Sequence, residues 1–290
     1  MKIYLTLSEK QMNKMITKTL LAAAVTTALG AFSSGAMAQT TTFPDFTVTE
    51  TSVAGANPFV FTADKITGNY VEVITFNGTA ASGTFDVALK WNAGQFVAND
   101  GKTPVATQLG GGAAGQTNQY GLYALYSGKG TYTGSNGATT FNFIPGGSLQ
   151  IFLDPNTDTT FNQPATGNVK YTTGGNSDDV LIVNGVPTFG AGTLDPSLST
   201  CTGGGINCGS FGATASIALT AAGSQYFTAP NPFYNVSFQS GQLNNFSPTG
   251  TQVINGSLDV IFAVPEPTSV ALIGLGLLGL GLSRRRKQQA

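Results

Sequence analysis

Between residues 39 and 263 the apolar side chains come in short alternating runs, and this pattern limits the fold more than any other feature of the chain. Residues 84–91, for example, read T-F-D-V-A-L-K-W, with Phe85, Val87 and Leu89 at every second position. Successive side chains of a β-strand point to opposite faces, so such runs predict strands with one buried face. No window in this region has the spacing and caps of an amphipathic helix. The pattern predicts an all-β fold.

Turn residues separate these runs about every ten positions, as in a sandwich or a barrel. The predicted strands are residues 70–76, 84–91, 120–126, 139–144, 148–153, 180–183, 213–220, 234–239 and 257–264. Asn-Gly pairs, which are typical of tight hairpin turns, occur at 77–78, 136–137, 184–185 and 255–256. We expect residues 39–263 to form an antiparallel β-sandwich of jelly-roll type.

Aromatic residues make up 10% of the chain, and they suit either a core or a surface on which sugars stack. Trp91 follows Leu89 on the apolar face of its predicted strand, which favours a place in the core. Tyr120, Tyr123 and Tyr126 lie three apart, so they should fall on alternating faces. We expect some of these tyrosines to be exposed and able to contact carbohydrate.

The N-terminal segment has the order of a secretory signal peptide. Two lysines precede an apolar stretch at 20–32, and small residues ending in A-M-A at Ala38 follow. This order predicts a signal peptide over 1–38 that signal peptidase cleaves after Ala38. A start at Met12 or Met15 gives a signal peptide of ordinary length, so the residues before them resemble an upstream extension.

The C-terminal segment 264–290 has three parts in sequence. They are a Pro-Glu-Pro turn at Pro265, Glu266 and Pro267, an apolar run at 270–282, and a basic cluster at Arg284, Arg285, Arg286 and Lys287. As a helix, residues 268–283 would span roughly 24 Å, less than the roughly 30 Å of a hydrocarbon core. Positive residues stay on the cytoplasmic side. The segment predicts a single short membrane helix that inserts transiently in the inner membrane.

Removal of both ends changes the charge of the protein. Residues 39–263 hold five lysines, no arginine and twelve acidic residues, a net charge of −7, whereas the whole chain has −1. Every arginine lies in the C-terminal basic cluster. A strongly acidic exported part cannot neutralise phosphates, so we expect no nucleic-acid partner.

The chain contains no histidine, which removes the commonest general base and the commonest transition-metal ligand. Catalytic triads with histidine and zinc sites with histidine are therefore excluded. A hydrolase with paired carboxylates needs no histidine and stays open as an alternative. We expect no enzyme activity and no required cofactor.

Cys201 and Cys208 are the two cysteines of the chain and flank a glycine-rich stretch, T-G-G-G-I-N. A close pair in an exported protein predicts a local disulfide. The loop that it closes is short, so its contribution to stability is modest.

The stretch 154–160 offers oxygen ligands at alternate positions, with Asp154, Asn156 and Asp158 in the first three. Calcium loops have this spacing, and Asp178 with Asp179 could add carboxylates from another loop. The EF-hand glycine and final acid are missing, so the stretch is no EF-hand. The residues fit either a structural calcium site or a polar turn after a strand.

The order V-P-E-P, glycine-punctuated apolar run and R-R-R-K resembles the PEP-CTERM sorting signal of Gram-negative bacteria that make exopolysaccharide. Pro265, Glu266 and Pro267 match its motif, 270–282 its membrane segment and 284–287 its basic end. The resemblance implies processing by an exosortase, a membrane cysteine protease or transpeptidase. It also implies export through the inner membrane to the cell surface or extracellular matrix.

A second resemblance covers most of the exported part. The exported part is similar to the flocculation-associated PEP-CTERM proteins in the stretches 43–50, 64–72, 149–158 and 178–181. This resemblance implies a non-enzymatic protein that promotes cell aggregation, in flocs or biofilm, together with exopolysaccharide. The alternative is a secreted carbohydrate-binding adhesin whose loops recognise the polysaccharide directly.

Overall fold

A computed structural model describes residues 43–110, 120–135, 137–201, 205 and 207–263. The chain divides into two compact units, 1–42 and 43–290, and all described residues lie in the second. The predicted signal peptide and the predicted sorting segment, with its membrane helix, lie outside the described residues. Within the described part, no helix has both the length and the apolar character that a membrane crossing requires.

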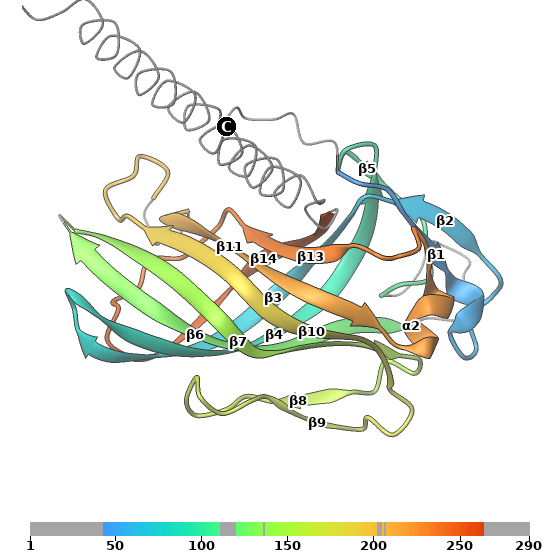
Figure 1. Cartoon of the computed structure of the whole chain (residues 1–290), viewed down its shortest axis with the longest axis horizontal. Coiled ribbons are helices and arrows are strands. Elements are labelled where there is room, and N and C mark those ends of the chain that lie inside the picture. The colour runs from blue at the N-terminus through green and yellow to red at the C-terminus, as the bar shows by residue number, and fades with distance from the viewer. Residues whose placement is uncertain (1–42, 111–119, 136, 202–204, 206, 264–290) are drawn as a thin grey trace, which may run out of the picture. The chain divides into compact units, whose positions relative to one another are not determined.

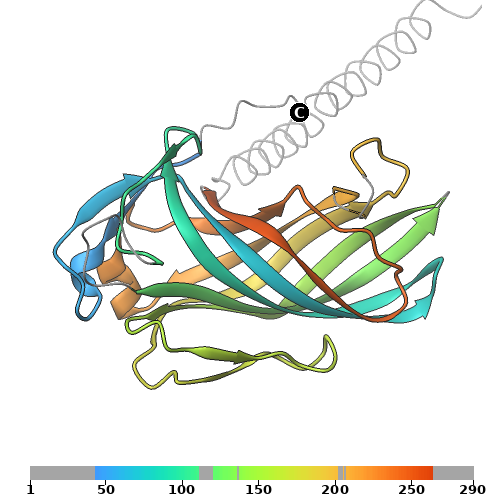
Figure 2. The same cartoon turned by 180° about the vertical axis from the view of Figure 1, so that it is seen from behind.

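The described residues form one large antiparallel sheet (Figures 1 and 2). Its strands are β3 (Lys65–Thr79), β4 (Ser82–Ala98), β5 (Thr103–Pro104), β6 (Gly121–Ser135), β7 (Ala138–Asp154), β10 (Val180–Leu194), β11 (Gly209–Leu219), β13 (Asn235–Ser240) and β14 (Gly250–Ala263). The order is β3-β14-β13-β11-β10-β7-β6-β4-β5, and β3 also pairs with β4. Eight strands therefore close into a barrel, with β5 as an appendage of β4.

The predicted sandwich is thus wrong, although the all-β class is right. In both architectures each strand buries one face and exposes the other, so the alternating pattern is the same. The difference is made by the ladder between the first and last barrel strands, β3 and β14, which runs from Lys65–Ile261 to Phe76–Gly250. Because β3 also pairs with β4 in a local hairpin, it has two partners and no free edge. Closure depends on the long-range β3–β14 pairing and on stagger, which local patterning does not contain.

Glycines opposite aromatic rings allow large side chains to fill the narrow barrel. Glycine and ring are directly paired across neighbouring strands in Phe85–Gly130, Phe143–Gly190 and Tyr70–Gly256. Trp91 lies over Gly68 from a diagonal position, since Gly68 itself pairs with Ala93, and its Nε1 donates a hydrogen bond of 2.9 Å to the carbonyl of Leu258. An eight-stranded barrel has an interior just wide enough for side chains, so large and small residues must alternate. Trp91 is 1% exposed, which confirms the predicted place in the core.

One end of the barrel is covered by a small sheet of β1 (Phe46–Thr49), β2 (Val60–Ala63) and β12 (Phe227–Ala229), with η1 (Glu50–Ser52) and α2 (Ala221–Tyr226) beside it (Figure 1). Phe46 of β1 packs edge-on against Phe227 and Phe262. Glu50 is fully buried there, and its carboxylate accepts hydrogen bonds from Gln108 and from the hydroxyl of Tyr120. This end is therefore closed by both apolar and polar packing.

The connection between β7 and β10 folds back over the outside of the barrel. It contains β8 (Thr160–Asn162) and β9 (Thr172–Gly174), which pair with each other and lie along the barrel wall in both views (Figures 1 and 2). Tyr171 packs on the outward-facing Val73 and Ala88. A second apolar layer thus covers part of the outer surface, where a strand would ordinarily carry polar side chains.

Each predicted strand overlaps an observed one, but the extents differ. The predicted strands 139–144 and 148–153 are one strand, β7, which bends where Pro145, Gly146 and Gly147 interrupt the register with β6. Such bulges bend a strand without ending it. Of the Asn-Gly pairs, the one at 136–137 separates Ser135 from Ala138, and these two residues pair where β6 and β7 end and begin. The others lie inside β3, β10 and β14.

Candidate functional site

The antiparallel pairing of β7 and β10 brings acidic residues from two parts of the sequence together. Asp154 is the last residue of β7, and Asp178 and Asp179 directly precede β10. Val180 pairs with Leu153, so the end of one strand lies beside the start of the other. The acidic residues therefore lie side by side at the two ends of the β7–β10 connection, which covers the barrel wall.

Carboxylate oxygens of Asp154, Asp158 and Asp178 lie within 4.8 Å of one another, a spacing that would suit one metal ion. Asp154 is 6% exposed, Asp178 is half-buried and Asp158 is exposed. Asn156 lies between the two turn residues in sequence and is exposed. The structure thus places Asp154 and Asp158 together, and of the two further carboxylates considered from the sequence it brings Asp178 into the cluster.

The turn after β7 is also held by its own hydrogen bonds. The two side-chain oxygens of Asp154 accept from the backbone N–H of Asp158, at 3.3 Å, and of Thr159, at 3.2 Å. Thr157 adopts a left-handed conformation with φ of 55°. These features are those of a polar turn, so the calcium and the polar-turn interpretations both fit the geometry.

Negative charge accumulates at this place. Asp179 accepts hydrogen bonds from the hydroxyls of Tyr123 and Thr159, the latter at 2.9 Å to both oxygens. Burial raises the pKa of Asp179, the neighbouring charges of Asp154 and Asp178 raise it further, and the two hydroxyl hydrogen bonds oppose these effects. One buried oxygen of Asp178 has no hydrogen-bond partner among the described residues.

Basic side chains do not balance this charge. Among the described residues, an ion pair of 3.0 Å joins Lys65 of β3 to Asp259 of β14, away from this cluster. Clustered carboxylates repel one another unless protons or a cation lie among them. Oxygen ligands of this kind are the ones that calcium prefers. A structural calcium therefore stays a prediction for Asp154, Asn156 and Asp158, with Asp178 near enough to be a further ligand.

We expect a chelator to lower the melting temperature of the protein if calcium binds at this cluster, because a ligand of the folded state stabilises it. Asp158→Asn should remove that sensitivity, since it takes away one charge and leaves the turn hydrogen bonds of Asp154 intact. Asp100→Asn, which removes an exposed charge elsewhere, should retain it. Thermal unfolding with excess chelator and with millimolar calcium makes the measurement. Identical curves in both conditions would leave only the polar turn.

Cys201 and Cys208 form a disulfide, with their Cα atoms 4.3 Å apart. The backbone N–H of Cys208 donates to the carbonyl of Leu243, and the N–H of Leu243 donates to the carbonyl of Gly209. Cys208 is thus held beside the segment that connects β13 to β14, and the disulfide links Cys201 to it.

A surface groove of about 290 Å³ lies next to the end sheet, between β11, α2, β12 and the segment 230–233. Its apolar lining includes Phe227 and Phe233, whose rings stack with centroids 5.0 Å apart. Exposed polar side chains on its lining are those of Ser224, Thr228 and Asn231. Sequence reasoning missed this groove, since P-N-P at 230–232 carries no alternation and its depth comes from three separate elements.

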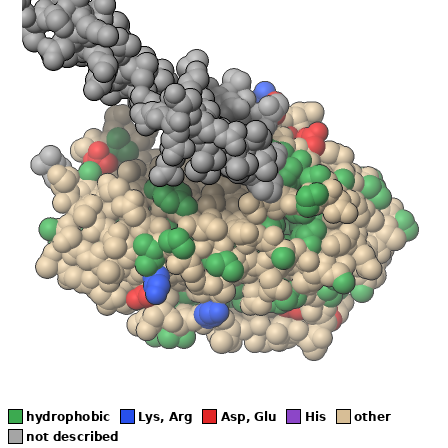
Figure 3. Space-filling view, in the orientation of Figure 1, with side chains coloured by type: hydrophobic (Ala, Val, Ile, Leu, Met, Phe, Trp, Pro, Cys, Tyr) green, Lys and Arg blue, Asp and Glu red, His purple; other side chains and the backbone are tan. Residues whose placement is uncertain are grey.

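The predicted exposed tyrosines are buried. Tyr120 and Tyr126 line the interior, and Tyr123 faces outward under the β8–β9 connection, where Phe152 stacks on it at 5.0 Å. Their exposed fractions are 1%, 8% and 3%. The alternation is right and the exposure is wrong, because a covering layer from distant sequence hides the outer face. Elsewhere, the face in Figure 3 is mostly uncharged.

Comparison with known protein families identifies a PEP-CTERM protein-sorting motif at residues 263–287. This match confirms the sorting signal predicted around Pro265, Glu266 and Pro267, which lies outside the described residues. The signal implies export and membrane-anchored sorting by an exosortase. No curated protein and no solved structure gives a significant match to the chain.

Proposed function

We propose that this chain, which carries a PEP-CTERM sorting signal, is a non-enzymatic protein of the cell surface or extracellular matrix. In this proposal it promotes cell aggregation, in flocs or biofilm, together with exopolysaccharide. The observation that supports it most is the place of the signal, which begins at residue 263, where the last barrel strand ends. A folded, acidic and otherwise sparsely charged domain is thus delivered by a sorting device.

The test compares cells that lack the protein with cells that produce it. Loss of the protein should slow the settling of cell aggregates, and the full chain should restore settling. A chain with Pro265, Glu266 and Pro267 all replaced by alanine should be made but should fail to restore it. Pro248→Ala, outside the motif, serves as the matched control and should restore settling. Equal settling with and without the protein would refute the proposed role.

We further expect processing near Pro265–Pro267, with loss of residues 268–290 from the mature protein. The reason is that the turn directly precedes the apolar run and basic cluster that the sorting machinery reads. Intact mass of the C-terminal peptide from surface-extracted protein gives both the cleavage position and any new attachment. Mature surface protein that still carries Arg284–Lys287 would contradict this expectation.

The second candidate function is direct carbohydrate binding, and the groove beside α2 favours it. An apolar floor of aromatic rings with hydroxyl and amide groups at the surface suits a sugar ring. Surface-extracted protein should then be retained by exopolysaccharide from the same cells, and Asn231→Ala should weaken retention. Asn69→Ala, an exposed amide on β3, is the control. Retention that is unchanged in both asparagine variants would mean that the polysaccharide binds outside the groove. Release of new reducing ends from the polysaccharide would instead indicate the hydrolase with paired carboxylates.

A further inference from the structure

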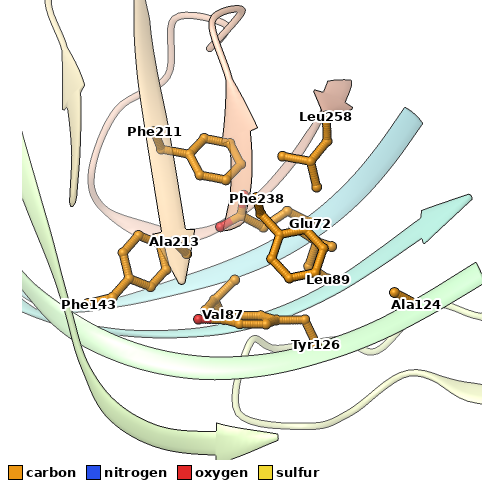
Figure 4. Close-up of a pocket in the computed structure, with 10 residues that line it drawn as sticks. All are labelled: Glu72, Val87, Leu89, Ala124, Tyr126, Phe143, Phe211, Ala213, Phe238 and Leu258. Carbon is orange, nitrogen blue, oxygen red and sulfur yellow. The ribbon is translucent and has the colours of Figure 1, made fainter. Parts of the chain in front are cut away.

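Glu72 lies inside the barrel with its side chain between two small cavities. Each cavity has a volume of about 20 Å³, and both are lined by Glu72, Phe143 and Phe211. Such a volume is about what one ordered water requires. Figure 4 shows side chains from several strands of the barrel pointing toward one another around the first cavity. Glu72 is 5% exposed and is the charged residue among those that line the two cavities.

Among the described residues, the other acidic side chains that are almost fully buried accept hydrogen bonds, whereas Asp178, with one unpaired buried oxygen, is only half-buried. Glu50 accepts from Gln108 and Tyr120, and Asp64 accepts from the backbone N–H of Asp100 and Gly101. Glu72 has no hydrogen bond or ion pair with any described residue. Folded proteins rarely leave buried polar groups unpaired, because the lost hydration is costly. This exception therefore requires an explanation.

Two further polar groups in the interior share this condition. The buried hydroxyls of Tyr70 and Tyr126 have no partner at hydrogen-bond geometry within the described part of the chain. Ser240 lies near enough to Tyr70 to lower the pKa of its hydroxyl slightly, but burial dominates and raises that pKa. Both tyrosines lie close enough to Glu72 for its charge to raise their pKa values as well. Of these two phenols, Tyr126 lines the first cavity together with Glu72, and the two cavities that share Glu72 are called the chamber below.

The other walls of this chamber are aromatic. Phe143, Phe211, Phe238 and Tyr126 line the first cavity with Glu72. A hard metal cation requires six or more oxygen ligands, which this chamber does not have. An organic ammonium ion instead interacts well with aromatic faces and needs one carboxylate as its counter-ion. In the bound state, the alkyl part of the ammonium ion would lie against these aromatic rings.

The wall next to the second cavity is a loop rather than a strand. β13 ends at Ser240 and β14 begins at Gly250, and between them Leu243 and Phe246 line the cavity. Phe246 stacks on Phe76 at 5.9 Å, without a ladder on either side of it. Displacement of this one side chain would enlarge the chamber without breaking a strand pairing.

We propose that the barrel interior is a binding site for a small primary amine, bound as its ammonium ion to Glu72 with its alkyl chain among the phenylalanine rings. The tyrosine hydroxyls of residues 70 and 126 accept or donate the remaining hydrogen bonds. The site is independent of the proposed role in aggregation, and it rests on the unpaired carboxylate, the shared cavities and the aromatic walls.

The test measures the melting temperature of the surface-extracted protein with n-butylammonium chloride, n-butanol, sodium butyrate or sodium chloride at equal concentrations. Butylammonium should raise the melting temperature in a saturable manner, and the other additives should not. Glu72→Gln should weaken butylammonium binding at least tenfold. Asp100→Asn should leave it unchanged, which separates the interior site from general attraction to an acidic surface.

Three results would overturn the proposal. They are the absence of stabilisation by butylammonium, equal stabilisation of the Glu72→Gln variant, and equal stabilisation by butanol. The last result would mean that the chamber recognises apolar chains without regard to charge. Glu72→Gln keeps the shape of the side chain and removes a buried charge, so the variant is expected to fold.

Discussion

At pH 9 the Glu72→Gln variant should be more stable than the unmodified protein by about 3 kcal/mol, whereas at pH 4.5 the two should be nearly equal. Burial raises the pKa of Glu72 from 4.5 to about 7 in the folded protein. The nearby titratable groups are the hydroxyls of Tyr70, Tyr126 and Tyr171, which remain neutral throughout this range. The glutamine amide resembles the protonated acid at every pH.

The sign of the effect follows from proton binding. Between pH 4.5 and pH 7 the folded protein holds a proton on Glu72 that the unfolded chain has released, so stability falls as the pH rises. Below pH 4.5 both states hold the proton, and above pH 7 neither does. The contribution of Glu72 is therefore fully present in acid and is lost through the folded-state pKa of about 7.

Urea unfolding of both proteins at several pH values between 4.5 and 9 makes this measurement. Other carboxylates titrate equally in the two proteins, so the difference between their free energies of unfolding isolates Glu72. Asp86→Asn on the same barrel, with its half-exposed carboxylate, should show no comparable difference. A constant difference between Glu72→Gln and the unmodified protein across this range would mean that Glu72 is not buried as described. The measurement must be made without added amines.

Gly68→Ala should destabilise the barrel by about 3 kcal/mol, because added volume in a rigid core forces neighbours to move. A Cβ atom on Gly68 would lie 2.2 Å from the backbone oxygen of Asn92 and 2.5 Å from Nε1 of Trp91. The backbone oxygen cannot move without disturbing the β3–β4 ladder. The indole cannot turn away without losing its hydrogen bond to Leu258.

Gly94→Ala, the same change on the neighbouring strand β4, is the matched control. The nearest atom to a Cβ on Gly94 would be the carbonyl oxygen of Thr67, at 3.6 Å, which is an ordinary contact distance. Gly94→Ala should alter the free energy of unfolding by less than about 0.5 kcal/mol. Chemical unfolding of both variants, followed by Trp91 fluorescence, gives the comparison. Equal stability of the two alanine variants would show that the ring does not pack on Gly68.

The strands could be predicted from the sequence because each buries one face, and residues such as Phe85, Val87 and Leu89 alternate accordingly. Their closure could not be predicted, because it depends on the pairing of the first barrel strand, β3, with the last, β14, far apart in sequence. The second half of β10 was missed as well. There, small residues such as Gly190 and Gly192 replace the apolar alternation, since large rings of neighbouring strands occupy the space.

The acidic cluster was partly predictable, because Asp154 and Asp158 are close in sequence and share one turn. Asp178 could be named from the sequence only as a possible further carboxylate, because its place beside Asp154 follows from the antiparallel β7–β10 pairing, which no local pattern contains. Glu72 carried no signal at all, since a polar residue at an inward position of an alternating strand resembles an ordinary interruption. Only its burial without a partner distinguishes it.

The last strand of the barrel leads directly into the sorting signal. β14 pairs with β3 from Gly250 to Ile261 and with β13 from Asp259 to Ala263, and the sorting motif begins at residue 263. With the barrel held at its far end, a pull on the C-terminus would therefore act along β14 and load its hydrogen bonds to β3 and β13 in shear. Under that load the hydrogen bonds would have to break together rather than one after another. A domain attached through its C-terminus would then resist mechanical extraction along this strand.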